Sequence, residues 1–494
     1  MFALFWPEMI FLNIYNSLYY NCERSIIMSE PVYKLKSGII TSLDAAAQSV
    51  GYIGPVFVVA FVTTYVAAGA GFAAPLAIFL AGLGSIAVGY VVAVFAMRHR
   101  AAGSLYTYLG KAFGPIAGFM GGWLYIFALL ASVVTMVVGI AGFISSFLAD
   151  FFDIHIQWFI FVIPEVIFLF WVSYFDIRWS TRVQLMLVAI SALAVLSLAT
   201  LIIFHGGAEG NSIKPFLPSS AEGLGSLASG LIFAMLMYTG YESAAVLAEE
   251  EKNRQAIPLA IIASVILALI FYVFVSYAFA IGFGEVGATD WGQDPTVLFT
   301  MAERYLGSWA VPVMFVMAII DAIAMSMAIL NTAARVLYAM GREGALPRIF
   351  GRTQKKYQTP HIANGVVLIM ALIFAAILSR VEGGWDIGFS FLAAITGIAL
   401  ELIYLSVVIA GLFYFKRVMG EDYSLFKHGM IPFIAIFVPA AALYGSLQPQ
   451  GGILNLAPYI VLVWILLGIG IIYYLRSSNP EMIAKIGSDM NIEN

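Results

Sequence analysis

The stretch Phe233–Ile262, FAMLMYTGYESAAVLAEEEKNRQAIPLAII, decides how this chain folds. It begins as an apolar helix of the kind that crosses a membrane, and residues 238–242 (YTGYE) then interrupt it. A carboxylate within a span costs about 2.5–3.5 kcal/mol on insertion scales, so Glu242 is expected to face a cavity or a partner and not lipid. Glycine lets the backbone leave helical geometry, which is tolerated at membrane depth where the backbone lines protein or water. The stretch therefore predicts a broken membrane helix with a polar site at the break.

The composition predicts an all-α polytopic membrane protein. The chain has 494 residues, of which 62% are hydrophobic and 11% charged, whereas soluble domains are about 45–50% apolar and about 25% charged. Apolar runs of about 20 residues recur along its length, which favours helices over the short alternating strands of a membrane barrel. The single cysteine, Cys22, excludes an intramolecular disulfide.

About twelve spans are expected, at residues 41–66, 74–97, 115–149, 156–175, 181–204, 224–249, 257–283, 310–341, 361–379, 386–415, 430–447 and 453–475. Of the 24 lysines and arginines, only Lys214, Arg304 and Arg380 then fall in outside loops, and the other 21 fall in inside segments. The positive-inside rule therefore predicts a multi-pass protein of the plasma membrane with both termini in the cytoplasm.

The first 27 residues are apolar and aromatic but lack a basic leading region, so they make a poor signal peptide. They are either an interfacial helix or the product of a mis-set start, with Met28 as the true first residue. The expected organisation is an N-terminal cytoplasmic segment (1–40), a five-helix repeat (41–204), a second five-helix repeat with its preceding outside loop (205–415), two further helices (416–475) and a cytoplasmic tail (476–494).

A second break is expected in the first span, where residues 48–55 read QSVGYIGP. Five spans separate it from the break at 238–242, so the two halves of the chain would have opposite topology. Helices interrupted by Gly or Pro at corresponding places in two halves indicate an inverted-repeat secondary transporter and its binding site. The alternative is that these glycines only allow close packing of helices.

Five motifs resemble those of the amino acid–polyamine–organocation family of permeases. They are the glycine-rich break at 51–54, the aromatic-x-Gly-aromatic-Glu run at 238–242, the segment from Glu249-Glu250 through Asn253 to Ile257-Pro258, the segment 102–108 (AGSLYTY) with Gly114-Pro115, and the series Asn331, Arg335, 338–340 (YAM), Arg342, Gly344, Leu346-Pro347 and Thr359-Pro360. The resemblance covers residues 40–362 well. It implies a fold of five plus five inverted repeats with two extra helices, and uptake or exchange of amino acids, or sometimes amines, by alternating access. No cofactor is expected.

A zwitterionic substrate needs an anion site and a cation site a few ångströms apart. A helix N-terminus offers free N–H groups to a carboxylate, and Pro55 suits the first position of the second half-helix. The free N–H groups of Gly51 to Gly54 are the candidates for the carboxylate, and carbonyls near Ser49 and from Leu236 to Tyr238 for the ammonium. The predicted substrate-binding set is Ser49, Gly51, Tyr52, Ile53, Gly54, Phe233, Leu236, Tyr238, Thr239 and Gly240.

Two positions depart from the pattern of the family. Many members have a bulky aromatic gate where this chain has Leu236, so the pocket is either wider or gated by Phe233, Tyr238 or Tyr241. Proton-coupled relatives carry a lysine midway along span 5, where this chain has Ser191. Sodium coordination by Ser191 with Ser326, coupling through a carboxylate, and transport without an ion all stay open, and no metal site is assigned.

Five acids are expected to be buried: Asp44, Glu165, Glu242, Asp321 and Glu401. Asp321, near the middle of span 8, could bind a substrate amine, carry a proton or make a structural hydrogen bond. For Glu242 the hypothesis is that its protonation couples to closure, which makes Tyr241, Glu242, Asp321, Ser191 and Ser326 the gating and coupling candidates. Asp44 is expected at a gate or surface, and Glu165 and Glu401 in packing networks.

Other classes of function have less support. The five histidines fall in loops or at span ends without metal-site spacing, which argues against an enzyme. There is no filter motif of a channel and no basic patch for nucleic acid. A neutral or broad-range amino acid is the first choice of substrate, a polyamine or other amine the second, and an exchanger or a non-transporting sensor remains an alternative. The oligomeric state is left open.

Overall fold

The computed structural model describes residues 34–380, 384–448 and 451–478. The predictions for residues 1–27 and for the tail beyond residue 478 lie outside these ranges. The spans are formed by α3 (Ser42–Ile53), α4 (Pro55–Ala70), α5 (Ala74–Arg98), α7 (Pro115–Phe152), α8 (Phe159–Tyr174), α9 (Ile177–Phe204), α10 (Leu224–Leu236), the 3-10 helix η5 (Tyr241–Leu247), α11 (Ala256–Phe283), α14 (Ala310–Arg342), α15 (His361–Leu378), α16 (Gly384–Val418), α17 (Ile431–Ala435), α18 (Phe437–Ser446) and α19 (Ala457–Ser478). Shorter helices are α6 (Leu105–Phe113), α12 (Ala288–Gln293) and α13 (Val297–Leu306).

The predicted all-α membrane class is confirmed. Within the described residues, 10 apolar helical stretches are long enough to cross a membrane. The first of them, Ser42–Arg98, covers the first two predicted spans, and the fourth span is the shorter apolar helix α8. The expected spans therefore all coincide with apolar helices.

The break in the first span is narrower than predicted. Helix α3 continues through Ile53, and only Gly54, with φ 57° and ψ 62°, leaves the helical path. Helix α4 starts at once with Pro55 in its first turn, a position where the missing N–H costs nothing. The residues from Gly51 to Ile53, which were expected to unwind, remain helical.

The break in the sixth span lies where it was predicted. Helix α10 ends at Leu236, and the chain turns through Gly240, whose φ of 106° suits glycine best. It resumes as the tighter helix η5. The four half-helices lie in the middle of the bundle, where α3 packs on α9, α11, α14 and η5, and α4 packs on α10, α12 and α14.

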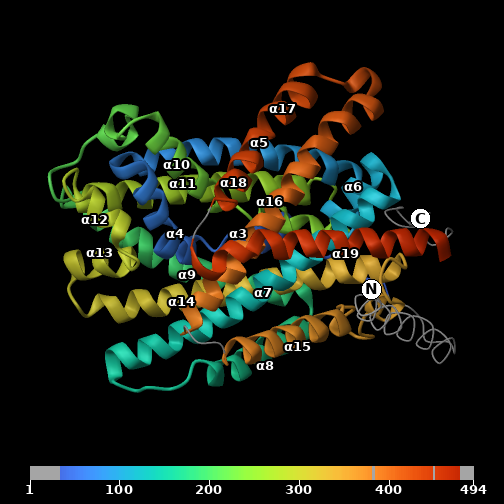
Figure 1. Ribbon diagram of the computed structural model, residues 1–494, viewed down its shortest axis with the longest axis horizontal. Helices are drawn as coiled ribbons and strands as arrows, with labels where there is room; N and C mark the ends of the chain where they lie inside the picture. Colours follow the sequence, from blue (N-terminus) through green and yellow to red (C-terminus); the bar gives the residue numbers. More distant parts are fainter. Residues whose placement is uncertain (1–33, 381–383, 449–450, 479–494) are drawn as a thin grey trace, which may run out of the picture.

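The two ends of the bundle carry different elements. Helices α12 and α13 lie at one end and α6 at the other, with the long helices running between them (Figure 1). Large apolar side chains of α17, α18 and α19 are exposed on the outside of the bundle, as expected for helices that face lipid.

Candidate functional site

The two breaks are joined through Ser49. Its hydroxyl donates to the carbonyl oxygen of Tyr241 at 2.6 Å and accepts the N–H of Ala244 at 3.1 Å. The hydroxyl of Ser243 donates to the carbonyl oxygen of Gln48 at 3.2 Å. The α3 half of the first span is therefore bonded to the η5 half of the sixth.

Glu242 is fully buried and held by two tyrosines. Its carboxylate accepts the hydroxyl of Tyr404, from α16, at 2.6 Å and that of Tyr125, from α7, at 3.1 Å. The Tyr404 hydroxyl in turn accepts the N–H of Gly240 at 3.1 Å, and its ring stacks on Tyr241. Glu242 thus faces partners and not lipid, as expected. Tyr125 and Tyr404 were missed, because no motif distinguishes them among the chain's 25 tyrosines.

Asp321 occupies the N-terminus of α4. One carboxylate oxygen, Oδ2, accepts the N–H groups of Val56 at 3.0 Å and Phe57 at 2.9 Å. The other, Oδ1, lies 3.2 Å from the hydroxyl of Ser191. Asp321 is fully buried, and its carboxylate joins α4, α9 and α14 at one point.

This geometry corrects the predicted carboxylate site. The N–H of Gly54 donates to the carbonyl of Val50, and residues 51–53 lie inside α3. The free N–H groups of the break are those of Val56 and Phe57, further along the chain, because helix α4 starts only after Gly54. Asp321 already accepts both of them.

Carbonyls at the ends of the first half-helices face Tyr272 of α11. Its hydroxyl lies 3.1 Å from the carbonyl oxygen of Met237 and 3.5 Å from that of Ile53. The carbonyl of Leu236 accepts the hydroxyl of Thr239 at 3.1 Å. These carbonyls end the first halves of both broken spans, but their hydrogen-bonding capacity is partly used by the protein itself.

Phe233, Tyr238 and Ser326 each make separate contacts. Phe233 is half-buried and stacks on Tyr65, and the hydroxyl of Tyr238 donates to the carbonyl of Ile78 at 2.9 Å. The hydroxyl of Ser326 donates to Ala322 of its own helix at 3.0 Å, while Ser191 contacts Asp321. In the described part of the chain, no group of three His, Cys, Asp or Glu side chains could hold a metal ion.

The other buried acids have separate surroundings. Asp44 caps the start of α3 through Thr41 and lies 3.9 Å from Arg182. Glu401 is buried on α16, three residues before Tyr404. Both carboxylate oxygens of Glu165 are buried without a hydrogen-bond partner among the described residues.

Phenylalanines close the bundle between the breaks and the α12–α13 end. Their rings form one connected cluster with centroid distances between 4.5 and 6.4 Å. We call this cluster the aromatic plug: Phe57, Phe61, Phe143, Phe299 and Phe315. A small cavity lies among these rings and is otherwise lined by Ile140, Ala318, Ile319 and Ala322. The sequence predicted none of these residues, because they come from four separate helices.

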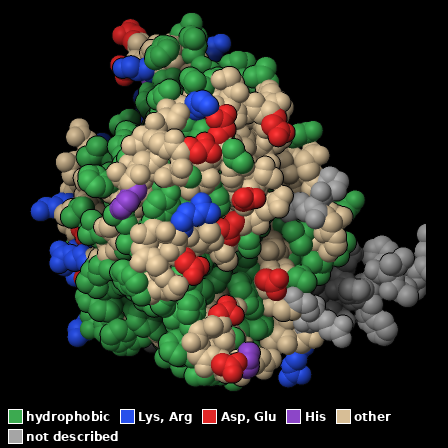
Figure 2. Space-filling model, turned by 90° about the vertical axis from the view of Figure 1, so that its left-hand side faces the viewer, with side chains coloured by type: hydrophobic (Ala, Val, Ile, Leu, Met, Phe, Trp, Pro, Cys, Tyr) green, Lys and Arg blue, Asp and Glu red, His purple; other side chains and the backbone are tan. Residues whose placement is uncertain are grey.

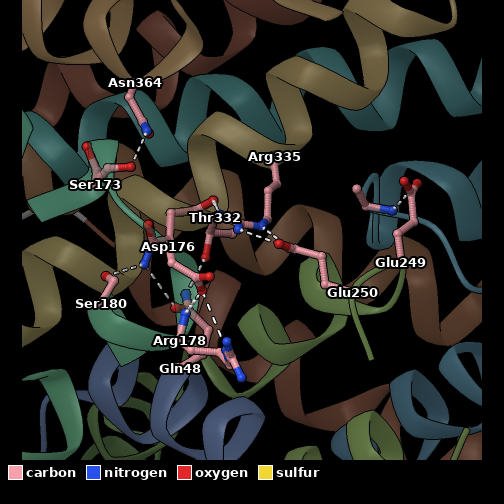
Figure 3. A network of polar contacts seen from close by, with 12 residues as sticks. Gln48, Ser173, Asp176, Arg178, Ser180, Glu249, Glu250, Thr332, Arg335 and Asn364 are labelled. Carbon is pink, nitrogen blue, oxygen red and sulfur yellow. Dashed lines mark hydrogen bonds and ion pairs between the residues drawn. The ribbon is translucent and has the colours of Figure 1, made fainter. Parts of the chain in front are cut away.

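Three consecutive glutamates close the opposite side, near α6. We call Glu249, Glu250 and Glu251 the acidic triplet. Glu249 pairs with Arg342 through two hydrogen bonds of 2.6 and 2.7 Å, Glu250 pairs with Arg335 at 2.8 and 3.3 Å, and Glu251 pairs with Arg100. The Glu250–Arg335 pair is almost fully buried, each side chain being 2% exposed, and Figure 3 shows the two side chains facing each other.

The segment before α3 is attached to the same loop. The N–H groups of Ile39 and Ile40 both donate to the carbonyl of Glu250 at 2.9 Å, and the N–H of Lys252 donates to Ile40 at 2.8 Å. The result is a short parallel β-bridge between Ile40 and Glu251.

A polar network ties α3, α9 and α14 together beside the acidic triplet (Figure 3). The side-chain amide of Gln48 donates to the carbonyl of Ala328 at 2.7 Å and to Thr332 at 3.2 Å. That of Asn331 donates to Ser180 at 3.1 Å. Gln48 and Asn331 therefore fix the inner part of the first span against α14 and α9.

Comparison with known proteins gives one consistent result. The amino acid permease family matches residues 40–472. The methylthioribose transporter of Bacillus subtilis (strain 168) is 22% identical over 95% of this chain and 100% of its own length. The branched-chain amino acid permease BcaP of the same organism is 25% identical, over 78% of this chain and 81% of its own. The low-affinity putrescine importer PlaP of Escherichia coli (strain K12) is 26% identical, over 62% of this chain and 67% of its own.

Proposed function

The chain belongs to the amino acid permease family and is a multi-pass membrane transporter, and we propose that it takes up amino acids across the plasma membrane by ion-coupled alternating access. The observation that carries the proposal is the meeting of the two helix breaks around buried carboxylates. Glu242 lies directly after one break, and Asp321 binds the half-helix that follows the other. Interrupted helices of this kind form substrate and ion sites in secondary transporters.

Contacts on both sides of the breaks support alternating access. The acidic triplet and the Gln48 network close the α6 side, and the aromatic plug closes the α12–α13 side. We propose that the plug separates when the site opens outward and the acidic triplet when it opens inward. The half-helices α3 and η5, which the Ser49 hydroxyl joins, would move together relative to the helices around them.

The proposed orientation places α6 and both termini in the cytoplasm. Few basic residues occur at the α12–α13 end, namely Lys214, Arg304 and Arg380. Figure 2 looks onto this end, and among the charged side chains across its middle the acidic ones outnumber the basic ones. Cations would therefore be attracted to the outer face.

The proposed substrate is a neutral or broad-range amino acid. The printed names of relatives include a transporter of branched-chain amino acids and an importer of putrescine, so both substrate classes are supported. An organic amine is the second candidate, favoured by Asp321, which is buried without a basic partner among the described residues. The coupling ion is proposed to be a proton or sodium.

Uptake into proteoliposomes tests the proposal. A mixed pool of radiolabelled amino acids is offered under an imposed proton gradient, then under a sodium gradient, and then to vesicles preloaded with amino acids. Accumulation under one gradient would establish that the protein is a symporter and would identify its ion. Uptake only into preloaded vesicles would establish that it is an exchanger. Absence of uptake in all three conditions, with folded protein, would contradict amino acid transport.

A further inference from the structure

Asp321 holds the position that a substrate carboxylate would need. Helix α4 begins with Pro55, which has no N–H, and the N–H of Val58 already donates to the carbonyl of Gly54 at 2.9 Å. The half-helix therefore offers two free amides, those of Val56 and Phe57, and Oδ2 of Asp321 accepts both. No second carboxylate can reach these amides while Asp321 stays ionised on them.

Within the described part of the chain, the surroundings of Asp321 contain no compensating charge. Among the described residues no Lys, Arg or His pairs with it. Ser191 faces it from α9, and Ile140, Phe143 and Phe299 line the adjoining cavity from α7 and α13. From α11, the titratable side chain at the breaks is Tyr272, whose hydroxyl donates to the Met237 carbonyl. Two carboxylates brought together here would repel each other in a buried site, so one of them would take up a proton.

Ser191 can serve both protonation states of Asp321 without moving. Its hydroxyl oxygen lies 3.2 Å from Oδ1 of Asp321 and 3.0 Å from the carbonyl oxygen of Val188. A serine hydroxyl has one hydrogen and two acceptor lone pairs. It can donate to ionised Asp321, or it can donate to Val188 and accept a hydrogen bond from protonated Asp321.

The cavity next to this point provides a place for a side chain. It is lined by Ala318 and Ala322, which flank Asp321 on α14, and by Phe57, whose N–H Asp321 accepts. A solute whose carboxylate reached the α4 amides would direct its apolar part into this cavity, which would have to widen as the aromatic plug separates.

We propose that Asp321 and the carboxylate of the transported amino acid compete for the two free amides of α4, so that the amino acid binds there only when Asp321 carries the coupling proton. This inference rests on the proposed function. A proton from the outer solution binds an oxygen of Asp321 as the substrate carboxylate takes over the amides. After both leave on the inner side, ionised Asp321 returns to Val56 and Phe57. One proton crosses with each amino acid, and the O–H bond on Asp321 is the bond that forms and breaks.

The test compares wild-type protein with Asp321→Asn in proteoliposomes. Asparagine has nearly the same shape but carries no titratable proton, and Asp290→Asn, an exposed acid on α12, is the matched control. The probes are the radiolabelled amino acid pool and, as an amine without a carboxylate, radiolabelled putrescine. Two quantities are measured: accumulation under an inward proton gradient, and counterflow into preloaded vesicles at several pH values.

Wild type and Asp290→Asn are expected to accumulate amino acids. Their counterflow at limiting substrate should fall as the pH rises through the range in which Asp321 ionises, by up to about tenfold for each pH unit. The reason is that substrate binding takes up one proton. Asp321→Asn should keep counterflow without this pH dependence and lose accumulation. Retained proton-driven accumulation in Asp321→Asn would overturn the inference. So would accumulation of putrescine instead of amino acids, since Asp321 would then bind the amine.

A measurement on wild type alone keeps the inference testable if Asp321→Asn does not fold. Titration of detergent-solubilised protein with the amino acid pool, in two buffers of different ionisation enthalpy, reports protons taken up on binding. About one proton per bound amino acid is expected, and none would overturn the inference. Sodium-driven uptake or exchange without protons would leave transport intact and refute only the role of Asp321. Absence of all binding and uptake would refute the proposed function and the inference with it.

Discussion

The ring of Tyr52 packs directly against the α-carbon of Gly240. A Cβ at Gly240 would lie 2.1 Å from the ring carbon Cδ1 of Tyr52, closer than any real side chain could come. This contact brings the two helix breaks together and depends on glycine for two reasons, since the φ of 106° also disfavours other residues.

Gly240→Ala should therefore impair transport strongly. The alanine methyl would push Tyr52 away and would strain the backbone by about 1–3 kcal/mol. We expect the initial rate of uptake to fall by about tenfold or more. The control is Gly225→Ala in α10, where a Cβ meets no atom within 4 Å, and it should retain the wild-type rate. Equal rates in the two variants would show that the contact at Gly240 is dispensable.

Glu242→Gln should slow transport while leaving the fold intact. The carboxylate accepts two tyrosine hydroxyls, and the oxygen of a glutamine amide cannot replace both acceptor atoms. The Tyr404 hydroxyl that also binds Gly240 would lose its orientation, so pH-driven uptake and counterflow should fall together. Elution as a single species on size-exclusion chromatography checks folding. Unchanged proton dependence would remove Glu242 from coupling, and loss of accumulation with normal counterflow would make Glu242, and not Asp321, the proton site.

Separating Glu250 from Arg335 should cost more stability than removing both charges. Each side chain is 2% exposed, so Glu250→Gln or Arg335→Met alone leaves a charge buried without its partner, at a cost of about 3–5 kcal/mol. The double variant should lose less than the sum of the two single losses. The melting temperatures of wild type, both single variants and the double variant, measured in detergent, complete a double-mutant cycle. The control is Lys214→Met, which breaks an exposed pair with Glu285 and should not measurably shift the melting temperature. Additive losses would mean that the pair has no coupling energy.

Asp176 should make the protein sensitive to acid. Burial by itself would raise the pKa of Asp176. This effect is outweighed by the hydrogen bonds from the N–H of Arg178 and from Lys36, together with the positive charges of these two residues, so that the pKa lies below its usual range. A carboxylate whose pKa is lowered by folding contributes stability above its unfolded pKa of about 3.9 and loses it as pH falls through the folded pKa.

The check is the melting temperature of wild type and Asp176→Asn between about pH 6 and pH 3. Wild type should be the more stable at the upper end, and the difference should shrink toward the lower end. The effect is expected to be modest, since the Asp176 side chain is 21% exposed and water screens it. A difference that stays constant with pH would show that the carboxylate charge is not involved.

The spans and both breaks could be predicted from the sequence because their signals are local. Apolar runs of about 20 residues mark each helix, and a glycine beside a proline or a carboxylate marks each interruption. The prediction for the first break extended too far only because Gly51 looks like Gly54 in sequence. In the structure Gly51 is packed against Gln184 within a continuous helix.

The partners of the buried acids could not be predicted, because they depend on which faces of distant helices meet. Asp321 was recognised as buried, but its binding to Val56 and Phe57 joins residues about 265 positions apart. The tyrosines around Glu242 and the rings of the aromatic plug lie on otherwise ordinary apolar helices. Nothing in their local pattern separates them from aromatic residues that only fill space.

The β-bridge between Ile40 and Glu251 couples two segments that are more than 200 residues apart in the chain, so that they are expected to move as one unit. The N–H groups of Ile39 and Ile40 both donate to the carbonyl of Glu250. The start of the first span therefore cannot change its position in the bundle unless the loop after η5 moves with it or these hydrogen bonds break. If the bridge stays intact through the transport cycle, spectroscopic labels at residues 38 and 252 will keep a fixed separation, while the distance from either label to a third at residue 355 will change.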